Sequence, residues 1–181
     1  LTSLRTTPNL ETWRPCDTSE TAISWLAALE NTNKPSALIL SRQGLPNFVR
    51  TKSQVESMKK GAYKLFEPEV EPKLVFIATG SEVELAMAIA EEVKDRTPIR
   101  VVSMPCSERF DIQSEEYKES VLGKGIKRIA IEASHVDWWR KYVGLEGEVI
   151  GLDTFGESAP GGVLFDHFGF TKEQIIAKLD L

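Results

Sequence analysis

An arginine stands directly after a short apolar segment in the stretch PSALILSRQGLPNF, residues 35–48. The apolar run Ala37–Leu40, bracketed by a proline and a glycine, is typical of a fully buried strand of a parallel sheet. Open α/β sheets bind ligands outside the carboxyl ends of their strands. At that place the planar guanidinium of Arg42 suits two oxygens of a phosphate, which favours an anion site. The alternative is that Arg42 covers the sheet edge or pairs with a carboxylate such as Asp17.

Two histidines are the only imidazoles of the chain. His135 follows a predicted strand and has Glu132 and Asp137 nearby, so it could act as a base. His167 lies in the segment FDHFGF. No serine or cysteine stands in a G-x-S-x-G elbow, which leaves either histidine without an activated nucleophile beside it. A surface or structural role is therefore the favoured interpretation for both.

The segment ATGSEVE, residues 78–84, has the layout of a phosphate loop: a strand, small residues and a helix N-terminus. Free backbone amides at such a place attract anions. Here, however, Ser81 and Glu84 have the spacing of a capping box, and Glu82 adds a second carboxylate to the first turn. Because these groups would satisfy the amides and repel a phosphate, the pattern predicts a helix cap instead.

The composition excludes several classes of protein. The chain has 181 residues and a formal net charge of −5, with Lys and Arg scattered along it. Nucleic acid and acidic membranes are therefore not the expected partners, and no apolar stretch is long enough for a membrane helix. Cys16 and Cys106 are the only cysteines, so we predict two reduced thiols in a cytoplasmic protein, with no disulfide scaffold and no structural zinc site.

Short apolar runs alternate with helical periodicity through most of the chain. This alternation predicts an α/β fold with a mostly parallel sheet, right-handed crossovers and helices on both faces. Asp17 is the expected N-cap of the first helix, and Thr171 that of the last. The predicted strands are 36–41, 61–66 at an edge, 74–78, 99–104, 128–133 and 148–153, and the predicted helices are 18–30, 82–96, 114–122, 136–144 and a C-terminal one.

The first part of the chain does not look like a complete domain. Residues 1–50 hold about one strand–helix unit, too little to bury a core alone, and are interpreted as the end of a domain that begins upstream. Residues 51–60 read as a linker, and residues 61–181 as a second α/β domain. The aromatic segment from Trp138 to Tyr142 suggests a buried anchor in the core or at a subunit contact.

Six strings in order carry a family resemblance that runs from Leu1 to Leu181. They are SLRTTPNLETWRPCD, ALILSRQGL, FIATGSEVELA, RVVSMPC, YVGLEG and TFGESAPGGVLFDHFGFT. Together they resemble the C-terminal part of a transketolase. The resemblance implies that residues 1–50 end the pyrimidine-binding domain and that residues 61–181 form the C-terminal domain.

The resemblance also implies a function. Transketolases of the pentose phosphate pathway are homodimers that move a two-carbon ketol unit from a ketose phosphate to an aldose phosphate. They use thiamine diphosphate and a divalent metal, Mg or Ca. The arginine of the family's LSRQ string, here Arg42, contacts the phosphate of the sugar. The family's catalytic, cofactor-binding and metal-binding residues match nothing after Leu1, so the resemblance assigns none here and implies that this chain alone is inactive.

Two other interpretations stay open at this stage. The chain could be the C-terminal region of another thiamine-dependent enzyme, such as a 2-oxoacid dehydrogenase β chain or a deoxyxylulose-phosphate synthase, although TFGESAP and WRPCD favour transketolase. It could also be a free-standing interaction or ligand-binding module. For the transketolase interpretation, the C-terminal domain is expected to complete the dimer. The carboxyl edge of its sheet, near Thr79–Ser81, Met104–Pro105, Ala133–Ser134 and Asp153–Thr154, is the place expected for a regulatory small molecule.

Overall fold

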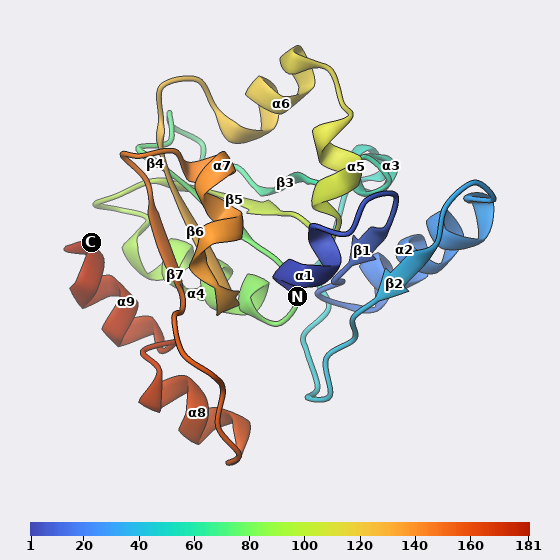
Figure 1. The fold of residues 1–181 in the computed structure, drawn as a ribbon. Coiled ribbons are helices and arrows are strands. Elements are labelled where there is room, and N and C mark those ends of the chain that lie inside the picture. Colours follow the sequence, from blue (N-terminus) through green and yellow to red (C-terminus); the bar gives the residue numbers. More distant parts are fainter.

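A five-stranded sheet forms the centre of the molecule, which a computed structural model describes over residues 1–181. The spatial order is β3-β5-β4-β6-β7, in which β3 alone is antiparallel to its neighbour (Figure 1). The expected edge strand is therefore confirmed, and its pairing with β5 is irregular between Lys64 and Phe66. The strands are β3 (Tyr63–Phe66), β4 (Leu74–Ala78), β5 (Ile99–Ser103), β6 (Lys127–His135) and β7 (Glu148–Leu152).

The two faces of this sheet carry separate cores, as the period-2 alternation of strands requires. Phe76 and Ala78 of β4 pack with α4 (Glu82–Val93) and α9 (Lys172–Leu179), and α8 (Gly161–His167) precedes α9. Val75 and Ile77 face the opposite side. That side is covered by α5 (Ser107–Asp111), α6 (Glu115–Leu122), η1 (Val136–Trp139) and α7 (Arg140–Val143). The prediction of helices on both faces is thus confirmed.

The aromatic anchor predicted near the end of β6 lies in this second core. Trp139 is fully buried, and the ring of Tyr142 lies 5.7 Å from it, centroid to centroid. Each extra aromatic contact of this kind adds to the stabilisation that burial of the rings already supplies. Trp138 is only half-buried and packs at the rim of the same cluster.

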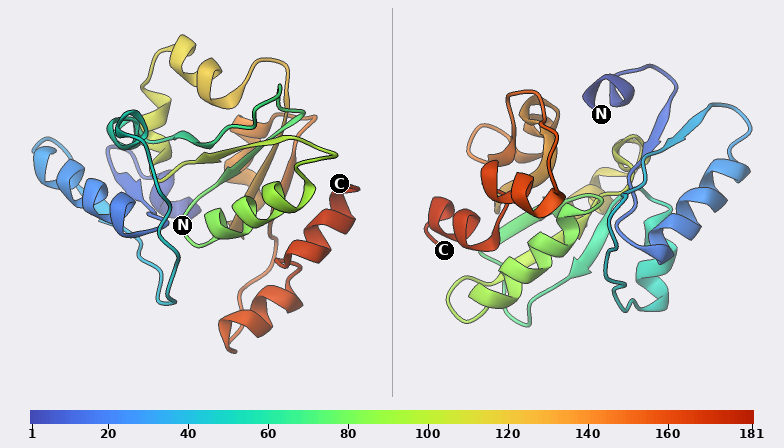
Figure 2. Two further views of the ribbon diagram at one scale, coloured as in Figure 1. Left: turned by 180° about the vertical axis from the view of Figure 1, so that it is seen from behind. Right: turned by 90° about the horizontal axis from the view of Figure 1, so that it is seen from below.

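The N-terminal part lies on the flank opposite the C-terminal helices (Figure 2). It consists of α1 (Thr2–Arg5), β1 (Glu11–Trp13), α2 (Thr18–Glu30) and β2 (Ser36–Leu38), with β1 and β2 paired in parallel. The connection to the main sheet holds α3 (Lys52–Met58), whose first turn is closed by a capping box between Thr51 and Gln54.

The prediction of a fully buried strand over 36–41 is wrong. Only Ser36–Leu38 is strand, its residues are half-buried, and Leu40 is 52% exposed. β2 has β1 as its single neighbour, so one edge and much of its surface meet no other element of this chain. An apolar run of this length therefore did not ensure burial.

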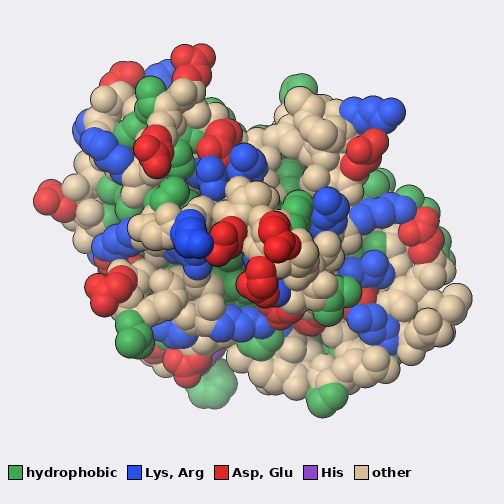
Figure 3. Space-filling view, turned by 90° about the horizontal axis from the view of Figure 1, so that it is seen from above, with side chains coloured by type: hydrophobic (Ala, Val, Ile, Leu, Met, Phe, Trp, Pro, Cys, Tyr) green, Lys and Arg blue, Asp and Glu red, His purple; other side chains and the backbone are tan.

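The surface shows no dominance of one charge. Figure 3 presents a face on which Lys and Arg side chains alternate with Asp and Glu. Elsewhere on the chain as well as here, opposite charges pair at the surface; examples are Lys127 with Glu148 at 2.7 Å and Lys141 with Asp111 at 2.7 Å. Every helix of the structure is too short or too polar to cross a lipid bilayer.

Candidate functional site

The side chain of Arg42 points into solvent from the loop that joins β2 to α3. It makes no hydrogen bond or ion pair within the chain. The predicted alternative partner, Asp17, is instead bound by Arg50, whose Nη1 lies 2.5 Å from Asp17 Oδ2. That alternative is therefore wrong. Arg42 is a guanidinium with all its donors available to a ligand.

The loop around Arg42 is fixed at both of its ends. At its start, the backbone N–H of Ile39 donates to Trp13 O at 2.8 Å. At its end, the N–H of Phe48 donates to Asp17 Oδ2 at 3.1 Å, and the N–H of Thr18 donates to Asn47 Oδ1 at 3.2 Å. A hollow of about 290 Å³ lies beside the loop. Its polar lining comes from Asp17, Thr18, Thr21, Ser41 and Gln43.

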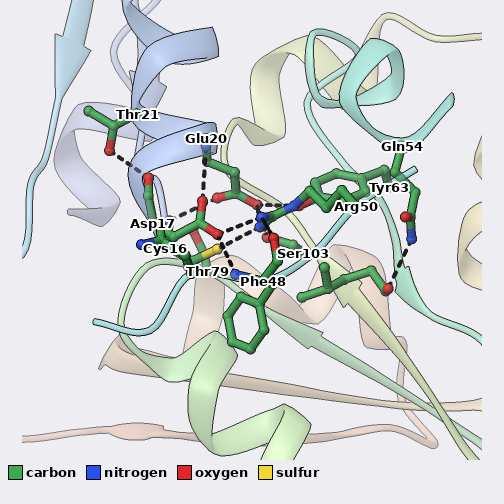
Figure 4. A network of polar contacts seen from close by, with 12 residues as sticks. Cys16, Asp17, Glu20, Thr21, Phe48, Arg50, Gln54, Tyr63, Thr79 and Ser103 are labelled. Carbon is green, nitrogen blue, oxygen red and sulfur yellow. Dashed lines mark hydrogen bonds and ion pairs between the residues drawn. The ribbon is translucent and has the colours of Figure 1, made fainter. Parts of the chain in front are cut away.

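A buried polar network, the Asp17 cluster, joins this region to the main sheet (Figure 4). It comprises Asp17, Glu20, Arg50, Tyr63 and Ser103. Arg50 donates to Asp17 and to the hydroxyl of Tyr63 at 2.7 Å, while Tyr63 and Ser103 donate to Glu20 Oε1 at 2.7 and 2.6 Å. Burial raises the pKa of Tyr63, and the neighbouring Glu20 carboxylate raises it further. The phenol is therefore a permanent donor at neutral pH.

A second buried network, the Glu132 cluster, lies at the carboxyl edge of the sheet and comprises Arg5, Arg14, Glu82, Glu132 and Trp139. Arg5 binds Glu132 through two hydrogen bonds of 2.6 and 2.9 Å, and the indole of Trp139 donates to it at 2.8 Å. Arg14 pairs with Glu82 and lies 3.3 Å from Glu132. Burial opposes ionisation of Glu132, yet Arg5 and Arg14 hold its pKa below the usual range.

Arg14 fills the place where the sequence suggested a ligand. Gly80 has a φ of +57°, and a Cβ there would lie 2.8 Å from the Arg14 side chain. Arg14 also donates its backbone N–H to Pro105 O at 2.8 Å and accepts from Thr79 Oγ1 at 3.0 Å. Arg14 therefore occupies the space at Gly80, whereas Ser81 and Ala133 border an open hollow, so a regulatory site at this edge stays a prediction.

The capping box predicted at Ser81 is wrong. Ser81 caps no amide; its hydroxyl instead donates to Glu82 Oε1 at 3.0 Å and accepts from Arg14 at 3.3 Å. What remains open is a hollow of about 270 Å³ at the side of this edge. Its lining is largely apolar and includes Ala133, Leu152, Phe165 and Phe168.

The two histidines are not brought together with a reactive group. His135 is 53% exposed and its Nδ1 lies 3.7 Å from Asp137 Oδ2, whereas Glu132 is bound to arginines instead. His167 is also exposed, 3.9 Å from Glu157. No group of three or more His, Cys, Asp or Glu side chains has the arrangement of a metal site.

Both thiols lie at the joint between the N-terminal part and the sheet. Cys16 and Cys106 are buried and unpaired. Burial raises the pKa of each thiol, and carboxylates beside them raise it further. Arg50 Nη2 lies 3.4 Å from Cys16 Sγ. Neither thiol is a nucleophile in this state, since a thiolate is needed for that role.

Sequence reasoning missed both buried clusters. One signal was available: Glu132 stands in the otherwise apolar run RIAIEA, and an unpaired carboxylate is almost never buried. Its partners could not be named, because Arg5 is 127 positions away and Arg14 is 118 positions away.

Two family models cover the chain. That of the transketolase pyrimidine-binding domain matches residues 1–47, and that of the transketolase-like C-terminal domain matches residues 61–171. Transketolase 1 of Escherichia coli is 50% identical over 178 residues, and transketolase 1 of Aliivibrio fischeri is 52% identical over 178 residues. These matches cover 97% of this chain but only 27% of each relative, so the chain spans about a quarter of their length.

Solved structures agree with this assignment. Transketolase from Leishmania mexicana superposes with a TM-score of 0.87 and 38% identity, over 98% of this chain and 26% of that one. A Pichia stipitis transketolase solved with sedoheptulose-7-phosphate gives a TM-score of 0.89 and 35% identity, over 98% of this chain and 25% of that one. Fold, sequence and domain order therefore lead to one conclusion: the chain belongs to the transketolase family.

Proposed function

We propose that this chain is the C-terminal part of a transketolase that transfers a two-carbon ketol unit from a ketose phosphate to an aldose phosphate. The observation that carries the proposal is the match to transketolases along the whole chain at about 50% identity. As in the family, the intact protein is expected to act as a cytoplasmic homodimer of the pentose phosphate pathway, with sugar phosphates as substrates.

Arg42 is the residue we assign to substrate binding. Its guanidinium is exposed and free of partners in the chain, and it lies beside a polar hollow that suits a hydroxyl-rich ligand. A phosphate far from the reacting carbonyl supplies binding energy that holds the ketol end in place. The Pichia stipitis relative was solved with a sugar phosphate, sedoheptulose-7-phosphate. That is the ligand class we propose here.

Thiamine diphosphate and a divalent metal are the cofactors that the family implies. The residues of this chain do not fit them. No metal-binding cluster is present, and the glycine turn between β4 and α4, which has the layout of a phosphate loop, is filled by Arg14 beside two carboxylates, Glu82 and Glu132. We therefore assign this chain no catalytic, cofactor-binding or metal-binding residue. We expect no turnover from it alone.

The test is the substitution Arg42→Ala in the full-length enzyme. Loss of a charge-assisted hydrogen bond costs about 1.5–3 kcal/mol, which corresponds to a rise of roughly 10–100-fold in the KM for a ketose phosphate. The KM for a ketol donor without a phosphate should stay within about twofold. Steady-state kinetics with both donors measures the KM ratio, the KM for the ketose phosphate divided by the KM for the phosphate-free donor.

Lys52→Ala is the matched control. It removes another exposed cation that makes no ion pair, and it lies at the start of α3, outside the loop that carries Arg42. It should leave both KM values unchanged. An Arg42→Ala enzyme that binds ketose phosphates as well as the parent would rule out the assignment.

A further inference from the structure

The position of Arg42 must be set by other residues, because nothing holds its own side chain. The loop that carries it, residues 39–51, contains neither helix nor strand. Backbone hydrogen bonds of Ile39 and Phe48 hold the two sides of the segment that contains Arg42. A guanidinium that is to meet a phosphate needs the backbone on both sides to stay in place, since misplacement by about 1 Å lowers rates severely.

A single carboxylate fixes the returning end of this loop. Asp17 Oδ2 accepts the N–H of Phe48 at 3.1 Å, while Asp17 Oδ1 caps α2 by accepting the N–H of Glu20 at 3.0 Å. The side chain of Asp17 is fully buried. Because both oxygens are used, the loop end and the start of α2 are tied to the same group.

Arg50 completes the tie from the other side. Its Nη1 donates to Phe48 O at 2.8 Å as well as to Asp17, so Phe48 is held through both its N–H and its C=O. Its Nε donates to Tyr63 of β3 at 2.7 Å. Arg50 is 2% exposed in its side chain and therefore cannot reach a substrate in the solvent-facing hollow. In Figure 4 the two charged groups and Phe48 lie together over the sheet.

We propose that Asp17 and Arg50 are positioning residues that clamp Phe48 and thereby hold Arg42 where it meets the phosphate of the substrate. This inference rests on the proposed function of Arg42. Through the hydrogen bond of Arg50 to Tyr63 of β3, the clamp attaches the loop of the neighbouring domain to the five-stranded sheet and limits the motion of the loop. The C-terminal domain thus contributes to substrate recognition without touching the substrate.

The experiment compares Arg50→Lys, alone and combined with Arg42→Ala, in the full-length enzyme. A lysine keeps the charge but cannot donate to Asp17, Phe48 O and Tyr63 at once. We expect the KM for a ketose phosphate to rise roughly 5–20-fold with kcat nearly unchanged, and the KM for a phosphate-free donor to stay within about twofold. In the Arg42→Ala background, Arg50→Lys should have no further effect on the ratio of the two KM values.

Arg5→Lys is the matched control, because Arg5 is an equally buried arginine of the interface that makes no contact with the loop. It should leave the KM ratio at the parent value. If Arg50→Lys fails to fold, Asn47→Ala removes a milder tie, the contact to the N–H of Thr18, without disturbing a buried charge. We expect it to raise the ratio about two- to fivefold.

The outcomes separate the two proposals. If Arg42→Ala leaves the KM ratio unchanged, the proposed role of Arg42 fails, and the positioning inference fails with it. If Arg42→Ala raises the ratio but neither Arg50→Lys nor Asn47→Ala does, the clamp alone is refuted. The clamp would also be refuted if Arg50→Lys raised the KM for both donors equally, or if it raised the KM ratio further in the Arg42→Ala background. Either result would show a general structural effect.

Discussion

Glu132 shows how a single buried charge links distant parts of the chain. It belongs to β6, is fully buried, and is held by Arg5, Arg14 and Trp139. A buried carboxylate without partners would be strongly destabilising, whereas one with satisfied partners fixes the arrangement of the groups around it. The charge of Glu132 is compensated only when the N-terminal segment lies where both arginines reach the carboxylate.

Glu132→Gln should lower the free energy of unfolding by about 3–5 kcal/mol at pH 7, because two buried arginines lose their shared counter-charge. The pKa of Glu132 is depressed in the folded state, so its stabilisation is present above the unfolded pKa of about 4.3 and is lost as the pH falls through the folded value. The difference in the free energy of unfolding between parent and variant should stay constant from pH 7 to about pH 5 and become smaller at lower pH.

Urea unfolding at a series of pH values measures this gap. Glu91→Gln is the control, since the Lys94–Glu91 pair is exposed and should change the midpoint very little. A gap that stays constant down to the acid limit would contradict the role of the ionised carboxylate.

At the scale of elements, the turn between β4 and α4 is shaped by a residue from another part of the chain. Gly80 adopts a positive φ, and the space that a Cβ would need is taken by Arg14. The conformation of the turn and the position of the N-terminal segment therefore depend on each other. A sequence comparison of the turn with phosphate loops could not reveal this, because the occupant is a protein side chain.

Gly80→Ala should cost roughly 2–4 kcal/mol, from backbone strain together with displacement of the Arg14 guanidinium. Gly125→Ala is the matched control: its φ is +72°, yet nothing lies within 4 Å of the added Cβ, so only strain of about 1 kcal/mol is expected. Chemical denaturation of both variants gives the comparison. Equal losses would mean that contact with Arg14 is unimportant.

Elements whose apolar residues recur with a clear period were predictable from the sequence, and features that depend on residues far away in the chain were not. β4 was predicted at 74–78 and α4 from residue 82, because their apolar spacing is set by the sheet and its cover. The prediction failed at β2, whose apolar run lacks a second neighbouring strand, and at Ser81, whose hydroxyl binds Arg14 and Glu82 instead of an amide. Arg42 was singled out from the sequence as a candidate anion ligand, whereas the contacts that Asp17 and Arg50 make with Phe48 in its loop were not predicted.

For the whole molecule, the N-terminal part and the five-stranded sheet are joined by two buried charged clusters. The Asp17 cluster ties α2 and the Arg42 loop to β3 and β5, and the Glu132 cluster ties α1 and the segment after β1 to β6. Trp13, Ala27 and Cys106 add an apolar contact across the same joint. Separation of the two parts would break these ion pairs and hydrogen bonds and expose the apolar contact to water.

Residues 1–181 produced by themselves should therefore unfold in one cooperative transition and transfer no ketol unit. The chain has four tryptophans, of which Trp13 and Trp139 are fully buried and should change their emission on unfolding. Tryptophan fluorescence and far-ultraviolet circular dichroism should give coincident urea curves. Two separate transitions would contradict the coupling. Turnover of a ketose phosphate by the isolated chain, with thiamine diphosphate and Mg²⁺ supplied, would contradict the proposed division of labour.

The burial of Cys16 and Cys106 at this joint has a consequence for chemical damage. Alkylating agents and peroxide attack thiolates, and both thiols are kept protonated and out of solvent. Attack must therefore wait until the two parts move apart, in an opening that closed molecules make only transiently. Oxidation of either sulfur would then prevent the joint from closing again, so in this chain a modified cysteine marks a molecule that had already opened.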